Sequence, residues 1–214
     1  MQSTNTQGEV TIAIVFHSGY GHTARQAQAV SDGVAQTPGA KALLLDVEQA
    51  QNEWVALESA DAIVFGAPTY MGSASAAFKA FMDASSGAFF KHAWQDKLAA
   101  GFTNSASRSG DKLATLMQFA IFAAQHGMHW ISLGLPPGNN NSRGSEHDAN
   151  RLGFFLGAAA QSNADEGADT APPQADLDTA RHLGQRVAQA AIQFARGRIA
   201  SRELDIPVQE GEKS

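Results

Sequence analysis

The chain of 214 residues contains no cysteine, and this absence removes several kinds of chemistry. Without thiols there is no disulfide framework, no thiolate nucleophile and no phosphatase of the C-x5-R kind. No apolar run approaches the roughly 18 residues that span a bilayer, and Met1–Glu9 is polar without a basic-then-apolar signal. We therefore expect a cytoplasmic protein without membrane insertion.

Positive charge is also scarce, since 15 basic residues face 21 acidic ones and the formal net charge is -6. This balance argues against nucleic acid or an anionic membrane as a partner. Hydrophobic residues make up 43% of the chain, enough to bury the core of one α/β domain. We expect a single domain over residues 1–200 and a loose C-terminal tail over 201–214, which is charged and poor in apolar residues.

Short apolar runs alternate with helical patterns along the chain, which predicts an α/β fold with a parallel sheet. The five runs expected to form buried strands are Ile12–Phe16, Ala42–Leu45, Ala62–Phe65, Leu98–Phe102 and Met128–Leu133. Repeated βα units imply right-handed crossovers and a doubly wound sheet. Five such units most often take the strand order 2-1-3-4-5, with ligands bound outside the carboxyl ends of the strands.

Helical periodicity predicts three core-facing stripes. They are Ala74, Ala77, Phe78, Phe81 and Met82; Leu113, Leu116, Met117, Ala120 and Ala124; and Ala180, Leu183, Val187, Ala191 and Phe194. The last stripe belongs to a helix expected over Leu177–Phe194 with Asp176 as its N-cap. Two turn-forming stretches, Pro136–Ser145 and Gln161–Pro173, are too long for simple connections. We expect them either to fold over the mouth of a ligand site or to reach a neighbouring protomer.

The loop after the first predicted strand, Ser18–Thr23, reads SGYGHT and contains no lysine. Because it opens a helix, the hydroxyls of Ser18 and Thr23 and nearby backbone N–H groups point at one spot, where the helix dipole favours an anion. The loop matches neither the Walker pattern nor the G-x-G-x-x-G dinucleotide fingerprint. It predicts a phosphate site, the alternative being an ordinary βα turn with Thr23 as the N-cap.

Two further loops, Ala67–Ser73 and Thr103–Asp111, are rich in small and hydroxylic residues. In the predicted strand order they meet the first loop at the carboxyl edge of the sheet. The only two tyrosines, Tyr20 and Tyr70, both fall in these loops and offer stacking partners to a flat ligand. The three loops together predict a site for a phosphorylated aromatic cofactor.

Four segments of the chain resemble the NAD(P)H:quinone oxidoreductases related to the tryptophan-repressor-binding protein, the WrbA family. They are SGYGHT at Ser18–Thr23, GAPTYMGSASAAFKAFMD at Gly66–Asp83, KLAAGFTNSAS at Lys97–Ser107 and QHGM at Gln125–Met128. The resemblance implies a flavodoxin-like three-layer sandwich with non-covalent FMN. It also implies ping-pong two-electron reduction of quinones, NADH or NADPH as hydride donor, and a homo-oligomer, either tetramer or dimer, with flavin sites near subunit contacts.

Carried over position by position, the resemblance implies a cofactor site made of the three loops and one more histidine. The implied residues are Ser18, Gly19, Tyr20, Gly21, His22, Thr23, Pro68, Thr69, Tyr70, Met71, Gly72, Asn104, Ser105, Ala106, Ser107, Arg108, Ser109 and His126. The first loop would hold the phosphate, with Tyr20 against the nicotinamide donor, and the second would flank the flavin ring. The third would donate hydrogen bonds to the pyrimidine edge. His126 and Phe89 would line the substrate side, from the same or a neighbouring subunit.

The chain departs from the family pattern in two places. Ser105–Ser107 stand where Thr-Gly-Thr is usual, and Phe89 stands where tryptophan is usual, which bears on quinone preference. Trp94, near Phe89, is expected in a substrate wall or a subunit contact. Arg108 is the only cation of the third loop, and we hypothesise that it stabilises the reduced flavin, the alternative being a solvated surface arginine.

The resemblance leaves other functions open. A flavodoxin-type one-electron carrier and a non-enzymatic regulatory binding protein are the two alternatives. The seven histidines show no metal-binding spacing, so no metal is expected. No side chain needs to act as an acid or base, because the flavin carries the chemistry.

Overall fold

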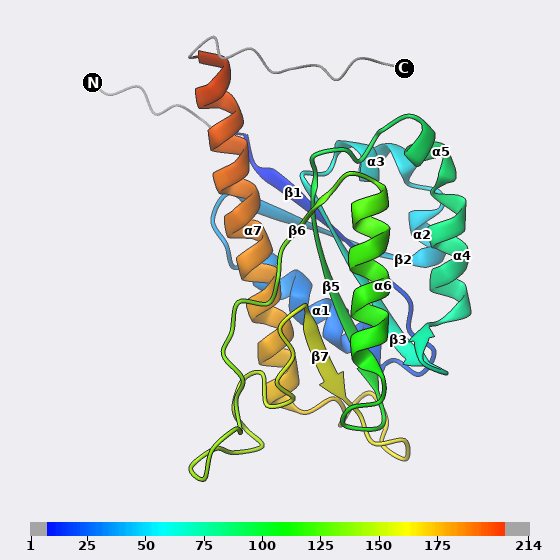
Figure 1. Ribbon diagram of the computed structural model, residues 1–214, viewed down its shortest axis with the longest axis vertical. Helices are drawn as coiled ribbons and strands as arrows, with labels where there is room; N and C mark the ends of the chain where they lie inside the picture. The colour runs from blue at the N-terminus through cyan, green and yellow to red at the C-terminus, as the bar shows by residue number, and fades with distance from the viewer. Residues whose placement is uncertain (1–7, 204–214) are drawn as a thin grey trace.

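The computed structural model describes residues 8–203, which form a parallel sheet between two layers of helices (Figure 1). The strands lie in the order β2 (Ala40–Asp46), β1 (Val10–Phe16), β3 (Ala62–Tyr70), β5 (Leu98–Ser105) and β6 (His129–Trp130). All of these neighbours pair in parallel. The predicted fold class and the order 2-1-3-4-5 are confirmed, with β5 and β6 as the fourth and fifth strands.

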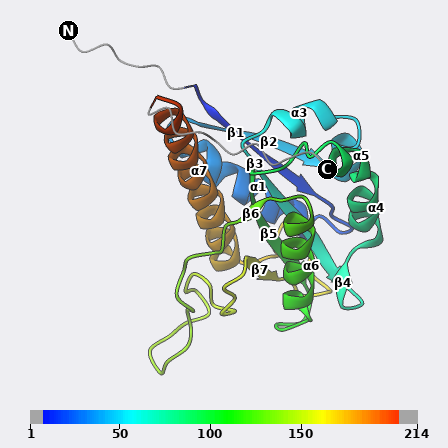
Figure 2. The same ribbon diagram turned by 45° about the horizontal axis from the view of Figure 1, so that its top comes forward.

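The central strands are apolar on both faces because helices cover both faces. Ile12 to Val15 have no exposed surface, and residues 62–69 of β3 are all buried. One face carries α1 (His22–Ala35) and α7 (Gln174–Glu203), and the other carries α4 (Ala76–Ala84) and α6 (Lys112–Gln125), as Figure 1 and Figure 2 show. The shorter elements are α2 (Val47–Ala50), α3 (Trp54–Ser59), α5 (Ser86–Phe90) and β4 (Ser73–Ala74), which pairs antiparallel with β3.

Helices α1 and α7 cross in close contact because each has a glycine at the crossing. A Cβ atom on Gly33 would lie 2.0 Å from the carbonyl oxygen of Arg181, and one on Gly184 would lie 2.0 Å from that of Val30. Any side chain at either position would push the helices apart. This close crossing joins the C-terminal half of α1, at Val30–Val34, to α7.

The fifth strand of the sheet is divided by an insertion. β6 pairs with the start of β5, and β7 (Ala158–Gln161) pairs with its end, so residues 131–157 leave the sheet between them. The predicted strand Met128–Leu133 is therefore wrong in extent, since the strand covers only His129–Trp130, and Ile131 and Leu133 pack against the core beyond its end. Three consecutive alanines form most of β7, and alanine gives little β signal.

The predicted core face of α6 is wrong. Of the five predicted positions only Leu116 is buried, whereas Leu113 and Met117 are about half exposed, at 51% and 50%. The positions that face the core are Lys112, Thr115, Leu116, Phe119, Phe122 and Ala123. The helix carries apolar residues on more than one side, so its periodicity fits several stripes. By contrast, Phe78 and Phe81 of the predicted α4 stripe are buried.

The last helix is longer than predicted. It begins at Gln174, so Asp176 lies in its first turn rather than at the N-cap, and it continues to Glu203, past the boundary expected at residue 200. The rest of the predicted tail lies outside the described residues. Phe194 is 37% exposed, because its ring lies beside the His129 ring and the Arg198 guanidinium rather than in the core.

Candidate functional site

A cavity of about 470 Å³ opens at the carboxyl edge of the sheet, beyond the ends of β1, β3 and β5. Its walls come from the three loops expected to meet there and from the segment that follows β7. The lining residues are Ser18, Gly19, Tyr20, His22, Thr23, Pro68, Tyr70, Asn104, Ser105, Ala106, Ser162, Ala164, Glu166 and Gly167. The topology thus brings together four segments that are far apart in the sequence.

The first wall of the cavity is the start of α1. Gly21 is the N-cap residue, in a left-handed conformation with φ of 84°, and no side chain caps the helix. Thr23 is buried within the first turn, so the alternative with Thr23 as N-cap is wrong. The first turn contains no acidic residue, and the buried Ser18 hydroxyl is without a hydrogen-bond partner among the described residues. Free N–H groups, the helix dipole and an unpartnered hydroxyl suit an anion.

The second wall is the end of β3, which contributes Pro68 and Tyr70 to the cavity. Tyr70 ends β3 and is 38% exposed, while Tyr20 is 78% exposed at the rim. A Cβ atom on Gly19 would lie only 2.6 Å from the Tyr70 hydroxyl, so glycine permits this close approach. Burial, together with nearby Tyr20, raises the pKa of Tyr70, which keeps its hydroxyl protonated.

The third wall is the segment Asn104–Ala106 at the end of β5. Asn104 is buried, and its side-chain oxygen accepts a hydrogen bond of 3.2 Å from the Ser162 hydroxyl. The side-chain amide of Gln161 donates to the carbonyl of Ala106 at 3.0 Å. Both contacts come from the end of β7, so the second half of the divided strand holds this wall in place.

The segment after β7 closes one side of the cavity. The His22 ring nitrogen Nε2 lies 2.8 Å from the Glu166 carbonyl, and Arg25 donates to the Ala168 carbonyl at 2.8 Å. A Cβ atom on Gly21 would lie 2.8 Å from Cβ of Ala168. Of the two long stretches, Gln161–Pro173 therefore reaches the cavity, whereas Pro136–Ser145 contributes no lining residue.

Several residues implied by the resemblance do not line the cavity. Thr69 is buried in the sheet, where its hydroxyl lies 2.8 Å from that of Thr103 and 2.7 Å from that of Thr115. Met71 and Gly72 form the exposed turn between β3 and β4, and Met71 has a positive φ of 48°. These three residues therefore lie next to the cavity walls without lining the cavity.

The far end of the third loop also turns away from the cavity. Arg108 and Ser109 line a separate groove of about 670 Å³, and the carbonyl of Ser107 points to Lys112. Arg108 is 63% exposed at its side chain and pairs with Glu146 at 2.9 Å. In the described part of the chain, the arginine thus has the surroundings of a surface residue rather than those of a cavity cation.

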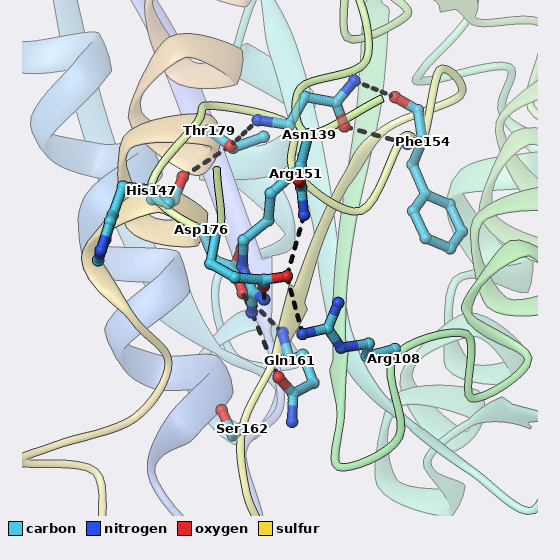
Figure 3. Close-up of polar contacts among 12 residues, drawn as sticks. Arg108, Asn139, His147, Arg151, Phe154, Gln161, Ser162, Asp176 and Thr179 are labelled. Carbon is cyan, nitrogen blue, oxygen red and sulfur yellow. Dashed lines mark hydrogen bonds and ion pairs between the residues drawn. The ribbon is translucent and has the colours of Figure 1, made fainter. Parts of the chain in front are cut away.

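An ionic cluster lies behind the third wall (Figure 3). Arg151, in the insertion, donates to both carboxylate oxygens of Asp176 at 2.8 and 2.9 Å and to Glu146 at 2.6 Å. Its side chain is 4% exposed and that of Asp176 is 2% exposed. Asp176 also accepts the backbone N–H of Gln161 at 2.9 Å. The cluster ties the insertion, β7 and α7 together beside the segment that holds Ala106.

His126 and Phe89 lie in another groove, of about 730 Å³, between α4, α5 and α6. Their ring centroids are 6.0 Å apart, and the His126 ring packs in a tilted arrangement against the Trp94 ring, with 4.3 Å between the centroids. Burial lowers the pKa of His126 to about 4, so the ring is neutral at neutral pH. Trp94 has no exposed surface, which makes its predicted place in a substrate wall or a subunit contact wrong within this protomer.

Sequence reasoning missed Lys112 and Arg151, which support the third wall. One signal was present: a lysine in the first turn of a helix opposes the helix dipole and calls for a partner. Arg151 carried no local pattern. The residues Ser162, Ala164, Glu166 and Gly167 close the cavity and fall in the stretch Gln161–Pro173, which was expected at the mouth of a ligand site or at a neighbouring protomer.

Residues 8–203 also contain no candidate metal-binding group and no candidate membrane-spanning helix. No group of three or more His, Cys, Asp or Glu residues there could hold a metal ion. No helix there is both long and apolar enough to cross a membrane.

The fold and the cavity define a flavodoxin-like α/β protein with a ligand site at the carboxyl edge of its sheet. The family described as NADPH-dependent FMN reductase matches residues 21–135. The chain belongs to this family, and the predicted general class, an FMN-dependent oxidoreductase, is confirmed.

Relatives and solved structures agree with this assignment. The chain is 45% identical over 185 residues to flavodoxin FldP of Pseudomonas aeruginosa, covering 85% of this chain and 96% of that one. It is 31% identical over 214 residues to an NAD(P)H dehydrogenase (quinone) of Geobacter sulfurreducens, covering 86% and 99%. A flavodoxin, WrbA-like protein from Agrobacterium tumefaciens has 41% identity and a TM-score of 0.68, over 86% and 99% of the two chains. The resemblance to the WrbA family is confirmed.

Proposed function

We propose that the protein binds FMN in the 470 Å³ cavity and uses NADH or NADPH to reduce quinones. The observation that carries this proposal is the buried, unpartnered hydroxyl of Ser18 at the uncapped start of α1. A buried polar atom without a partner costs free energy, and a phosphate oxygen would accept its hydrogen bond. The residues present therefore fit FMN.

Each wall has a separate task in this proposal. Ser18, the backbone N–H groups from Gly19 onward and Thr23 bind the phosphate. Pro68 and Tyr70 lie beside the ring system, and Asn104–Ala106 supply polar groups to its edge. When bound, FMN supplies hydride and electron transfer between the nicotinamide and the quinone. The protein excludes water and orients both substrates, and Tyr20 at the exposed rim stacks on the nicotinamide.

The names of relatives support two versions of the function. Several relatives at 28% to 31% identity are named NAD(P)H dehydrogenase (quinone). The relative at 45% identity is named flavodoxin, which favours a one-electron carrier as the second candidate. We favour the enzyme, because the exposed Tyr20 offers a nucleotide a stacking surface at the mouth of the cavity.

One assay separates these candidates. The protein is saturated with FMN, freed of excess flavin, and mixed with NADH or NADPH and benzoquinone. If the protein is the enzyme, it oxidises NADH or NADPH faster than the same concentration of free FMN does. A carrier retains FMN without this turnover, and a regulatory protein without flavin retains none; either result overturns the proposal.

A variant of Tyr20 sharpens this assay. Tyr20→Ala should raise KM for NADH or NADPH by about fivefold and leave FMN retention intact, because stacking contributes on the order of 1 kcal/mol. Val55→Ala is the matched control, since Val55 is 77% exposed on α3, outside the cavity. Loss of FMN in Tyr20→Ala would place this ring at the flavin rather than at the nicotinamide.

We also propose that the protein is a homo-oligomer. Leu113, Met117 and Ile121 are spaced four residues apart on α6 and are 51%, 50% and 65% exposed, which gives an apolar stripe next to the Phe89 and His126 groove. A neighbouring protomer on this stripe would bring that groove to a subunit contact. Ile121→Lys should lower the mass measured by light scattering, whereas Val55→Lys should not. A monomeric wild-type protein would refute the proposal.

A further inference from the structure

Lys112 is buried at a position that is unfavourable for a lysine. It is the first residue of α6, and its side chain has no exposed surface. A cation at the N-terminus of a helix opposes the helix dipole, and burial of an ammonium group adds a desolvation cost. The surroundings of the ammonium must offset both costs.

All the hydrogen bonds of the ammonium go to one short segment. Nζ donates to the Ser105 hydroxyl at 2.7 Å, to the Arg108 carbonyl at 3.0 Å, and to the Ser107 carbonyl. These three acceptors use all three N–H bonds of the ammonium. The segment Ser105–Arg108 is therefore wrapped around the lysine side chain.

The turn between this segment and α6 allows the segment to surround the lysine side chain. Gly110 and Asp111 both have positive φ values, of 49° and 53°. A Cβ atom on Gly110 would lie 2.2 Å from the Ser105 hydroxyl oxygen, so glycine leaves the room that the turn requires. The turn brings the lysine back beneath the residues that line the cavity.

The charge of Lys112 has no direct counter-ion in the part of the chain that the structure describes. Its ammonium forms no ion pair within residues 8–203, and its most favourable charge interaction is with Asp176, which Arg151 already binds through two hydrogen bonds. Arg151 repels it. Burial lowers the pKa of Lys112 to about 8, so the ammonium is mostly charged at pH 7.

We propose that Lys112 is a positioning residue for the cofactor: it holds Ser105–Arg108 in shape, and its positive charge favours the anionic FMN. This inference rests on the proposed function, because it assumes FMN in the adjacent cavity. Ser105 belongs both to the cavity lining and to the lysine contacts, and so it links the two. The role that the sequence analysis gave to the charge of Arg108 is therefore assigned to Lys112, because Arg108 pairs with Glu146 outside the cavity.

The test is FMN titration of the flavin-free protein, followed by fluorescence between pH 6.5 and 9. Lys112→Met should bind FMN about tenfold more weakly than wild type at pH 7, and Lys112→Arg should recover most of that loss. Wild-type affinity should fall as the pH rises through about 8, and the Met variant should lack this fall. Lys79→Met, which changes an exposed lysine on α4, is the matched control.

A second measurement does not depend on FMN. Backbone amides of residues 105–109 should exchange hydrogen faster in flavin-free Lys112→Met than in wild type. Equal FMN affinity in Lys112→Met, an unchanged pH profile, or unchanged exchange would each overturn the inference. If wild type itself binds no FMN, the proposed function fails, and the exchange rates still decide whether the lysine holds the loop.

Discussion

The two main walls of the cavity are built in different ways. The wall at Ser18–Thr23 is one continuous segment whose helix supplies the N–H groups. The wall at Asn104–Ala106 depends on Lys112, on Gln161 at the end of β7, and on Ser162, which follows that strand. The first is therefore readable from local sequence, whereas the second exists only because distant segments meet. Substitutions in each wall test this difference.

The largest expected effect comes from the ionic cluster behind the Asn104–Ala106 wall. Arg151→Met leaves the buried Asp176 carboxylate without its partner, so the free energy of unfolding should fall by about 3–5 kcal/mol. Urea unfolding measures this. Arg143→Met, at an exposed position of the same insertion, should change it by less than about 0.5 kcal/mol. A small loss in Arg151→Met would show that the insertion does not support the wall.

A negative charge in the wall at Ser18–Thr23 should be enough to weaken FMN binding. Ser18→Asp places a carboxylate where the phosphate is expected, so FMN affinity should drop by about 100-fold, because close like charges repel strongly. Ser142→Asp, at an exposed position in the insertion, is the control. Riboflavin, which lacks the phosphate, should lose much less affinity. Equal losses for FMN and riboflavin would contradict a phosphate site at Ser18.

The charge of Lys112 should also change how the free energy of unfolding depends on pH. The folded-state pKa of Lys112, about 8, lies below the unfolded value of 10.5. Between these values the unfolded chain binds more protons, so stability rises with pH. From pH 8 to 10, wild type should gain on the order of 1–3 kcal/mol relative to Lys112→Met. Burial also lowers the pKa of Lys97, but this lysine is present in both proteins, so its contribution cancels in the comparison. Parallel pH curves would contradict this burial cost.

The smallest expected effects separate two contacts of the third loop. Gln161→Ala removes the hydrogen bond to the Ala106 carbonyl and should weaken FMN binding by about fivefold. Arg108→Ala should change FMN affinity and the flavin midpoint potential very little, because its exposed ion pair with Glu146 contributes about 0–1 kcal/mol. A larger effect of Arg108 than of Gln161 would restore the hypothesis that this arginine stabilises reduced flavin.

Local patterns predicted much of the fold. The strand order and the meeting of three loops follow from apolar runs and from the rules of parallel sheets. The face of α6 did not follow, because Leu113, Met117 and Ile121 are apolar yet exposed. The division of the fifth strand did not follow either, because Ala158–Ala160 give little strand signal.

The site shows the same division. Ser18, Tyr20 and Tyr70 were identified from loop chemistry, and all three line the cavity. Lys112 contacts its segment only after a turn with two positive φ values, and Arg151 meets Asp176 across 25 positions of the chain. The Arg151 contact depends on tertiary structure, and the local Lys112 contacts depend on turn conformations that the sequence pattern did not indicate.

A crystal structure with FMN tests the central claim most directly. We predict the phosphate within hydrogen-bonding distance of the Ser18 hydroxyl and the first N–H groups of α1, and the ring between Tyr70 and Asn104–Ala106. FMN lying instead in the groove beside Arg108, or a cavity that stays empty at saturating FMN, would contradict the account.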